Sequence, residues 1–432
     1  GTSPLDAPTV RRLGAALVRA LPRAADTHRL VIGRDTRESG RWLASELAHG
    51  ARSAGGRVDS AGVISTPAIA YLTREGEYDA GVVISASHNP FEDNGIKVFS
   101  GAGEKFTEAL ESRVEALVAD PSWAEPQGEA EAVPEFGLVD HYLAHARDAL
   151  GGLMPAHVRR IAVDCANGAT HEIAPRLLCE LGFEVVAIHC GPDGRNINLG
   201  CGSTHPGGLA RLVAEQHCDV GMAFDGDGDR VILVDASGRL VDGDAMLFIC
   251  ARQMKAAGRL RGDAIVATVM SNVGLELALR QHGIGIVRCP VGDKYVMEEL
   301  INRGLAIGGE QSGHVIFTDS LYTGDGLVTA LNVLRVMAET GRSLGDLAAG
   351  LVTYPQVLVN VRVREKRDWT AIPDVADAAS RVEGRLNGRG RLLIRYSGTG
   401  PLLRIMIEGE HQDRIAQWAE EIAAEVKAAI GE

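Results

Sequence analysis

The stretch Asp79-Ala80-Gly81-Val82-Val83-Ile84-Ser85-Ala86-Ser87-His88-Asn89-Pro90 combines a strand signal with a polar loop. Its first half, residues 79–84, is apolar and rich in β-branched side chains, which predicts a buried strand. Asn89-Pro90 forces an extended or turn backbone that cannot continue as helix. We therefore expect Ser87 on a rigid bend at the end of a strand, where open α/β sheets bind ligands.

The surroundings of Ser87 allow two interpretations. A presented hydroxyl beside His88, with Lys97 further along the loop, suits covalent chemistry on the serine oxygen. A polar turn without chemistry explains Ser-His-Asn-Pro about equally well, because short motifs also occur by chance. Three later stretches favour the first interpretation.

The composition is that of an ordinary globular protein of 432 residues, with 45% hydrophobic and 23% charged residues. A single core stops growing at about 250 to 300 residues, so roughly three or four domains are expected. The net charge of −13 and the lack of a Lys/Arg-rich run argue against nucleic acid as a partner. No apolar run approaches the roughly 18 residues of a membrane helix, so no membrane partner is expected.

The seven cysteines are scattered along the chain and form no C-x-x-C pair. This pattern fits reduced thiols better than a disulfide framework or a zinc site. No signal peptide opens the chain, and we expect a cytoplasmic protein.

Short apolar runs alternate with helical stretches from residue 29 onward, which predicts βαβ units and mixed or parallel sheets. The pattern starts again near residue 160 and near residue 243, whereas the segment from about residue 358 has a different order. The predicted fold class is α/β, with three α/β domains of similar mixed-sheet topology and a smaller α+β domain at the C-terminus. The expected boundaries are 1–152, 153–242, 243–352 and 353–432.

The second chemical stretch, Asp225-Gly226-Asp227-Gly228-Asp229-Arg230, has carboxylates at alternate positions. The glycines allow a tight loop that turns the three side chains to one point, which suits a hard cation such as Mg²⁺. An EF-hand does not fit, because its sixth position would be Arg230 instead of Gly and its twelfth Ala236 instead of Glu. A simple Asp-Gly turn needs fewer carboxylates, so the metal interpretation is favoured.

Two further loops are suited to a sugar phosphate. Gly308-Gly309-Glu310-Gln311-Ser312-Gly313-His314 offers a carboxylate, a hydroxyl and an imidazole to a hydroxyl-rich ligand, although His314 could also be a core histidine. Arg395-Tyr396-Ser397-Gly398-Thr399-Gly400-Pro401, with Arg404 behind it, offers an anion backbone N–H groups, two hydroxyls and a guanidinium. A Gly/Pro turn with a surface arginine is the alternative for this second loop. No Walker A motif is present, so a nucleotide is not the obvious phosphate carrier.

These four stretches, in this order, resemble the α-D-phosphohexomutase family over essentially the whole chain. In that family the serine of Ser-His-Asn-Pro is phosphorylated and Asp-Gly-Asp-Gly-Asp binds Mg²⁺. Gly-Glu-x-Ser-Gly-His selects the sugar, and Arg-x-Ser-Gly-Thr holds the substrate phosphate. The resemblance implies domains around a central cleft, one Mg²⁺ per chain and a sugar 1,6-bisphosphate intermediate. The implied partner is a small-molecule sugar phosphate, and a homodimer is a compatible assembly.

The resemblance also implies a role for individual residues. The catalytic group would contain the phosphorylated Ser87, with Lys97 as first and His88 as second candidate for proton transfer, and Arg34 nearby. The implied metal ligands are Ser87, Asp225, Asp227 and Asp229. The implied substrate-binding residues are Arg230, Lys294, Glu310, Ser312, His314, Arg395, Ser397, Gly398, Thr399 and Arg404.

The loop around Gln311, together with residues 198–206 and 291–296, resembles the bacterial branch of the family that acts on glucosamine phosphates. That branch interconverts glucosamine 6-phosphate and glucosamine 1-phosphate, which feeds UDP-N-acetylglucosamine and cell-wall synthesis. The branches that act on mannose or glucose phosphates are the alternative, and a metal-dependent sugar phosphatase is a more distant one. The chain departs from the branch at Lys294, where Arg is usual, and at Tyr396 and Gly400, where Pro and Glu are usual.

Overall fold

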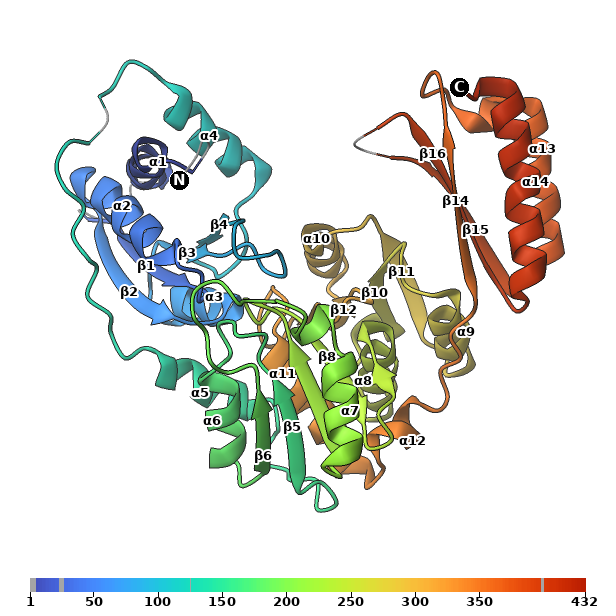
Figure 1. Ribbon diagram of the computed structural model, residues 1–432, viewed down its shortest axis with the longest axis horizontal. Coiled ribbons are helices and arrows are strands. Elements are labelled where there is room, and N and C mark those ends of the chain that lie inside the picture. The colour runs from blue at the N-terminus through green and yellow to red at the C-terminus, as the bar shows by residue number, and fades with distance from the viewer. Residues whose placement is uncertain (1–4, 23–26, 125, 398–399) are drawn as a thin grey trace. The chain divides into compact units, whose positions relative to one another are not determined.

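The computed structural model describes residues 5–22, 27–124, 126–397 and 400–432. Its contacts divide the chain into two compact units, one of Gly1–Met270 with Ile286–Ala349 and one of Ser271–Gly285 with Gly350–Glu432. The first unit contains three sheets and the second contains one, and all four are visible in Figure 1.

The first sheet has the strand order β2-β1-β3-β4. β1 pairs in parallel with β2 and β3, whereas β4 returns antiparallel to β3. β3 is buried over its whole length, as expected for a central strand of a covered sheet. The strands are β1 (Arg29–Arg34), β2 (Arg57–Val63), β3 (Ala80–Ile84) and β4 (Ile96–Ser100), and the helices are α1 (Ala7–Ala20), α2 (Gly40–Ser53), α3 (Thr66–Glu75), α4 (Glu108–Ala119) and α5 (Val139–Asp148).

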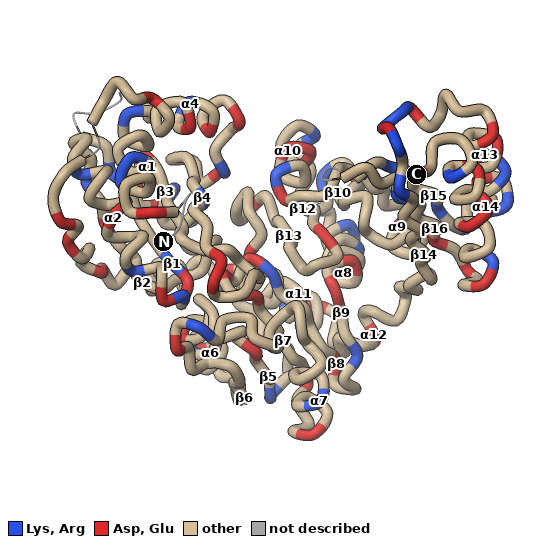
Figure 2. Tube along the Cα trace, turned by 45° about the horizontal axis from the view of Figure 1, so that its top comes forward, with Lys and Arg blue, Asp and Glu red and all other residues tan. Residues whose placement is uncertain are grey.

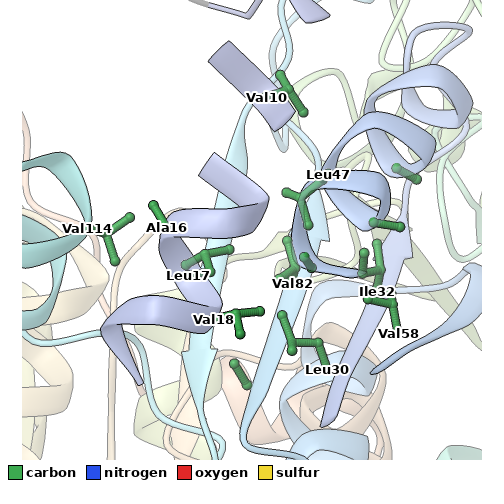
Figure 3. Packing of buried hydrophobic residues seen from close by; sticks show 14 of the residues in the cluster. Val10, Ala16, Leu17, Val18, Leu30, Ile32, Leu47, Val58, Val82 and Val114 are labelled. Carbon is green, nitrogen blue, oxygen red and sulfur yellow. The ribbon is translucent and has the colours of Figure 1, made fainter. Parts of the chain in front are cut away.

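The core of this sheet lies between its strands and α1 and α2. Leu30, Ile32 and Val82 from the strands meet Leu17 and Leu47 from the two helices, and all are buried (Figure 3). The two helices pack closely because glycine lies at their contact. A Cβ atom on Gly14 would lie 2.0 Å from the carbonyl oxygen of Leu47, so any larger residue there would push the helices apart.

The second and third sheets repeat this arrangement, with the orders β6-β5-β7-β8-β9 and β11-β10-β12-β13. In each, a parallel pair is followed by an antiparallel strand. The second sheet contains β5 (Arg160–Asp164), β6 (Glu184–Ile188), β7 (Val220–Phe224), β8 (Val231–Asp235) and β9 (Leu240–Val241), with α6 (Ile173–Glu180) and α7 (Gly207–Glu215). The third contains β10 (Ala264–Thr268), β11 (Gly285–Cys289), β12 (Ile307–Gly309) and β13 (Val315–Phe317), with α8 (Gly243–Ala256), α10 (Asp293–Arg303), α11 (Gly326–Thr340) and α12 (Leu344–Ala348).

The second unit is built on an antiparallel sheet of order β14-β16-β15. Its core joins β-strand residues such as Ile405 to Val382 of α13 and Ile422 of α14. The elements are α9 (Val273–Gln281), β14 (Gln356–Arg362), α13 (Pro373–Leu386), β15 (Gly390–Tyr396), β16 (Leu402–Gly409) and α14 (Gln412–Ile430). Asn272, which caps α9, donates to the backbone oxygen of Tyr354 at 3.0 Å, so α9 belongs with this unit although it lies far earlier in the sequence.

The predicted fold class is confirmed: three α/β sheets of one recurring topology precede a smaller α+β part. Several elements were not predicted individually, among them α1, β4 and α13. The domain boundaries and the arrangement around a cleft stay predictions. Within the part of the chain that the structure describes, no helix has the length and apolar character needed to cross a membrane.

Candidate active site

Ser87 lies three residues beyond the end of β3, and its side chain is buried, with 8% exposed. Its hydroxyl donates to Asp225 Oδ2 at 2.6 Å, and its backbone N–H donates to Ser85 Oγ at 2.9 Å. Its φ of +50° is in the left-handed region, which a non-glycine residue adopts only when its surroundings hold it there. The structure thus joins the serine loop to the acidic loop.

Arg37 is one of the groups that hold this loop, and it was not selected as a site residue from the sequence. Its guanidinium is fully buried, is paired with Asp35 at 2.8 Å, and donates to the carbonyl oxygens of Ser87 (3.0 Å), Asn89 (2.9 Å) and Pro90. A planar fork of donors can satisfy several carbonyls at once, which fixes the loop. The signal was present, because Arg37 follows β1, the parallel neighbour of β3.

Asn198 holds the same loop from the second sheet. Its side-chain amide donates to the backbone oxygens of Ser87 at 2.8 Å and Asn89 at 3.0 Å. The sequence indicated this residue only as part of the stretch 198–206. Its contact with the serine loop could not be read from the sequence, since the two loops are more than a hundred residues apart.

The acidic loop between β7 and β8 brings Asp225, Asp227 and Asp229 together. One oxygen of each carboxylate lies within 4.8 Å of the others, and all three side chains are buried. Glycine is needed here, because a Cβ atom on Gly226 would lie 2.6 Å from the carbonyl oxygen of Ser87. The predicted convergence of the three carboxylates is what the structure shows.

This donor set fits a divalent cation. Asp227 Oδ1 and Asp229 Oδ1 are buried without a hydrogen-bond partner, a costly state that a bound cation would relieve. All the donors are oxygen atoms, the type that hard cations prefer. The acidic loop is therefore a site that could bind a metal ion.

Lys97, from β4, forms ion pairs with two of these carboxylates. Its ammonium lies 2.6 Å from Asp227 Oδ2 and 3.6 Å from Asp229 Oδ2. Burial alone would lower the pKa of Lys97, but Asp227 and then Asp229 raise it above its ordinary value. Lys97 therefore carries a proton at neutral pH.

The carboxylates themselves have different environments. Burial, followed by the repulsion of Asp229 and Asp227, raises the pKa of Asp225 well above its ordinary value. Burial alone would also raise the pKa of Asp229, but Lys97 and then His314 hold the pKa of Asp229 well below its ordinary value.

Thr66 is a further neighbour of the acidic loop that the sequence did not indicate. Its Oγ1 donates to Asp227 Oδ2 at 2.5 Å.

Three further predicted residues are His88 beside Ser87, Arg230 at the end of the acidic loop and Arg34 at the end of β1. Arg230 donates to His88 Nδ1 at 3.2 Å. Partial burial, and then Arg230, lower the pKa of His88 below its ordinary value. Arg34 instead pairs with Glu135 at 2.9 Å, and no contact with Ser87 is described.

The residues predicted to bind the sugar lie in the loop between β12 and β13. His314 is buried, accepts from the Gly324 N–H at 3.0 Å through Nε2, and has Nδ1 3.7 Å from Asp229 Oδ2. Glu310 accepts from the Gly292 N–H at 3.1 Å, and Ser312 is exposed.

Lys294 is the second residue of the helix α10 and lies beside acidic residues of α4. Its ammonium lies 3.1 Å from Glu108 and 3.9 Å from Glu111. Figure 2 shows the acidic residues of α4 in red and basic residues of α10 in blue. A phosphate that binds Lys294 must compete with these two carboxylates.

In the second unit, Arg395 and Arg404 lie directly opposite each other on β15 and β16. Arg404 donates to Ser397 Oγ at 3.5 Å, its Nε is buried without a partner, and Lys366 donates to the Ser397 carbonyl at 2.7 Å. Cross-strand like charges repel, and an anion between them would remove the repulsion. Gly398 and Thr399 lie outside the described residues.

Family models match four successive parts of the chain. All four are described as phosphoglucomutase/phosphomannomutase: α/β/α domain I matches residues 1–125, domain II matches 141–238, domain III matches 242–354 and the C-terminal domain matches 358–425.

Curated relatives match over nearly the whole chain. A protein of Solibacter usitatus named phosphoglucosamine mutase is 46% identical over 100% of this chain and 97% of its own. One of the same name from Pelotomaculum thermopropionicum is 49% identical over 96% of this chain and 93% of its own.

Solved structures with the same fold are more distant in sequence. A phosphoglucomutase/phosphomannomutase family protein from Burkholderia thailandensis has a TM-score of 0.79 at 24% identity, over 99% of this chain and 94% of its own. N-acetylphosphoglucosamine mutase of Aspergillus fumigatus, in complex with GlcNAc-6P and magnesium, has a TM-score of 0.63 at 19% identity, over 84% of this chain and 92% of its own. At these identities the two structures are evidence of the fold alone.

Proposed function

Because this chain belongs to the phosphoglucomutase/phosphomannomutase family, we propose that it interconverts glucosamine 6-phosphate and glucosamine 1-phosphate. The reaction is an intramolecular phosphoryl transfer, which places the enzyme among the isomerases. The observation that carries the proposal is the 2.6 Å contact between the Ser87 hydroxyl and Asp225 of the acidic loop. The choice of an amino sugar follows the relatives named phosphoglucosamine mutase.

In this proposal Ser87 carries the transferable phosphate. The phosphorus–oxygen bond to Ser87 breaks as a bond to O1 of glucosamine 6-phosphate forms, which gives the 1,6-bisphosphate. The bisphosphate then reorients and returns its 6-phosphate to Ser87. Mg²⁺ held by Ser87, Asp225, Asp227 and Asp229 would stabilise charge on the transferring group.

The protein side chains supply positioning and charge. Arg37 and Asn198 hold the carbonyls of the serine loop, so the phosphate of Ser87 has one orientation. Lys97 is protonated in the resting site and can stabilise the departing serine oxygen or donate its proton to it. His88, with its lowered pKa, is unprotonated at neutral pH and is the group we assign to accept the proton of O1.

The substrate-binding residues divide between the two ends of the sugar phosphate. Glu310, Ser312 and His314 are assigned to the sugar, and Glu310 can also pair with an amine at C2. Arg230 and Lys294, which belong to the same unit as these three residues, are assigned to phosphate oxygens of the substrate. The phosphate that is not being transferred is assigned to Arg395, Ser397, Gly398, Thr399 and Arg404.

The cytoplasmic location of the protein and its assembly as a homodimer stay predictions.

Substrate comparison tests the proposal. We expect kcat/KM for glucosamine 6-phosphate to exceed that for glucose and mannose phosphates by about tenfold or more, because the half-buried carboxylate of Glu310 loses its ion pair with the C2 ammonium when a hydroxyl replaces it. Equal or better efficiency on mannose or glucose phosphates would contradict the amino-sugar assignment. Release of inorganic phosphate at the rate of turnover would instead identify a phosphatase.

A further inference from the structure

A mixed set of metal-binding donors lies outside the acidic loop, at the ends of β5 and β6. Asp164 is the last residue of β5, His189 directly follows β6, and Cys201 precedes a short 3₁₀ turn. One donor atom from each lies within 4.8 Å of the other two. The two strands are parallel neighbours in register, which brings their carboxyl ends to one place.

The three side chains differ in exposure in a way that suits a bound ion. Asp164 and Cys201 are buried, whereas 39% of the His189 side chain is exposed. His189 Nδ1 lies 3.0 Å from Asp164 Oδ2. The buried carboxylate and thiol are held inside the fold, and the imidazole is the donor that reaches solvent.

The Asp164 carboxylate is held in place by the backbone. Oδ1 accepts from the Ala166 N–H at 2.9 Å, and Oδ2 accepts from the Gly202 N–H at 3.0 Å. A carboxylate has about four acceptor positions, so Oδ2 can still serve as a ligand. A purely structural role for Asp164 would account for these two bonds, but it requires neither an imidazole nor a thiol beside the carboxylate.

We propose that Asp164, His189 and Cys201 bind one divalent transition-metal ion of the zinc type, with water as the fourth ligand. Nitrogen, sulfur and oxygen are the ligand atoms that zinc uses, and three protein ligands with one water is a common zinc arrangement. The acidic loop, with oxygen donors alone, favours harder cations. The cysteine spacing argued against a zinc site, because the three ligands come from separate loops and leave no local motif.

The site is connected to Ser87 through Asn198. The Asn198 N–H donates to the carbonyl oxygen of Ala166 at 2.9 Å, while its side chain donates to the carbonyl oxygen of Ser87 at 2.8 Å. An ion that fixes residues 164–166 and 201–202 would therefore stiffen the support of the serine loop. It should raise the thermal midpoint of the protein.

Cobalt(II) is a suitable probe, because a thiolate ligand gives it a charge-transfer band in the near ultraviolet that oxygen ligands do not give. The full-length reduced protein is first treated with chelator, then supplied with excess Mg²⁺ to occupy the acidic loop, and then titrated with Co²⁺. We expect a saturable band at one Co²⁺ per chain, which Zn²⁺ removes. Cys179→Ser, a change at an exposed thiol, should keep the band.

Two variants separate the proposed site from other thiols. Cys201→Ser should lose the band, and His189→Ala, a change at an exposed residue, should keep the fold and weaken Co²⁺ binding by about tenfold or more. No band in the wild-type protein, an unchanged band in Cys201→Ser, or unchanged affinity in His189→Ala would each overturn the proposal. Because the readout is spectroscopic, the result does not depend on mutase activity.

Discussion

Lys97 stands beside the buried carboxylates in the position of a counter-charge. It contacts Asp227 and Asp229, while one oxygen of each of these side chains has no hydrogen-bond partner. The negative charge of these buried carboxylates therefore has to be neutralised by a cation, which is either the Lys97 ammonium or a metal ion.

We expect Lys97→Met to destabilise the protein much more without divalent metal than with it. Removing one partner of a buried ion pair typically costs about 3 to 5 kcal/mol, and bound metal would offset part of that loss. Thermal unfolding in chelator and in excess Mg²⁺ measures the difference. Lys255→Met, which removes a partner of Asp263 away from the site, should lose the same stability in both conditions; equal losses for Lys97→Met would contradict the account.

Arg37 gives a second test at the scale of one residue. Arg37→Lys keeps the charge, but its three donors on one nitrogen cannot replace the four bonds that Arg37 makes to Asp35 and to three carbonyls of the serine loop, so Ser87 should lose its fixed orientation. Small misplacements of a reacting group can cost about 10²-fold in rate. We expect a fall of that size in kcat with little change in KM, and no effect of Arg41→Lys on the exposed face of α2. A changed KM with normal kcat would assign Arg37 to substrate binding instead.

Single residues were predictable from the sequence where the chemistry lies in a local motif. Ser87, Asp225, Asp227 and Asp229 stand in short stretches whose residue types point to one use, and the structure brings them together. Arg37, Asn198 and Thr66 were not predictable in the same way. Each acts through a contact with a loop distant in the sequence, and such a contact depends on the folded arrangement of neighbouring strands.

At the scale of elements, α11 begins beside the acidic loop. The Gly326 N–H donates to the Gly228 carbonyl oxygen at 3.0 Å, and Asp325 caps the helix by accepting from the Val328 N–H at 3.0 Å. Tyr142 of α5 donates to both oxygens of Asp325 at 3.0 Å. The buried carboxyl group of Asp325 thus joins the first turn of α11 to α5, and the backbone bond of Gly326 joins the same turn to the acidic loop.

Because Asp325 is buried, we predict that the free energy of unfolding depends on pH through the titration of this carboxyl group. Burial raises the pKa of Asp325 to about 6, above the ordinary 3.8, so the folded state holds this proton more tightly than the unfolded state. The contribution of Asp325 to stability is therefore greatest below pH 4 and falls as the pH rises to about 6. The difference corresponds to about 3 kcal/mol.

Denaturant unfolding of the wild type and of Asp325→Asn across this pH range checks the prediction. The asparagine has no such proton to lose, so the stability of the variant relative to wild type should improve by about 2 to 3 kcal/mol between pH 4 and pH 7. Parallel stability curves, or a relative loss for the variant as the pH rises, would show that Asp325 does not titrate in this way.

The elements themselves were predictable where periodicity was strong. β3, with its continuous apolar run, was predicted within one residue. β4 was not, since it follows the serine loop directly and its partly buried side chains show no clear alternation. α1 had a usable signal in the Asp6 cap, the proline of the first turn and the apolar spacing of Val10, Leu13 and Leu17.

At the scale of the whole molecule, the same strand arrangement recurs in three sheets before a different fourth one. This order was visible in the sequence as three occurrences of one pattern, although no residue repeat accompanied them. The family assignment made from four motifs is confirmed by the matches along the chain. The relative placement of the parts was not predictable, because it depends on long-range contacts that local patterns do not encode.

The second unit carries a prediction about substrate affinity. Arg395 faces Arg404 across two strands, so a phosphate bound there would gain from both charges. We expect Arg395→Ala to raise KM by about tenfold with a smaller change in kcat, since a phosphate held in both ground and transition states contributes uniform binding. Arg381→Ala, a change on the exposed face of α13, is the matched control and should leave both constants unchanged. A normal KM in Arg395→Ala would remove this arginine from the site.

The segment 351–356 is predicted to act as a hinge for the second unit. Small-angle scattering should then show a more compact molecule with saturating glucosamine 6-phosphate than without it. Identical scattering in the two conditions would contradict hinge closure, but it would leave the phosphoserine relay untouched.

The relay through Ser87 is the central claim, and transfer of a labelled phosphate tests it most directly. The dephosphorylated enzyme is incubated with radiolabelled glucosamine 1,6-bisphosphate and then chased with unlabelled glucosamine 6-phosphate. The account predicts one label per chain on Ser87, transfer of that label to the hexose phosphate at the rate of turnover, and no labelling of Ser87→Ala, with Ser122→Ala as the unaffected control. Full mutase activity without label on Ser87, or label that is not chased into the sugar, would contradict it.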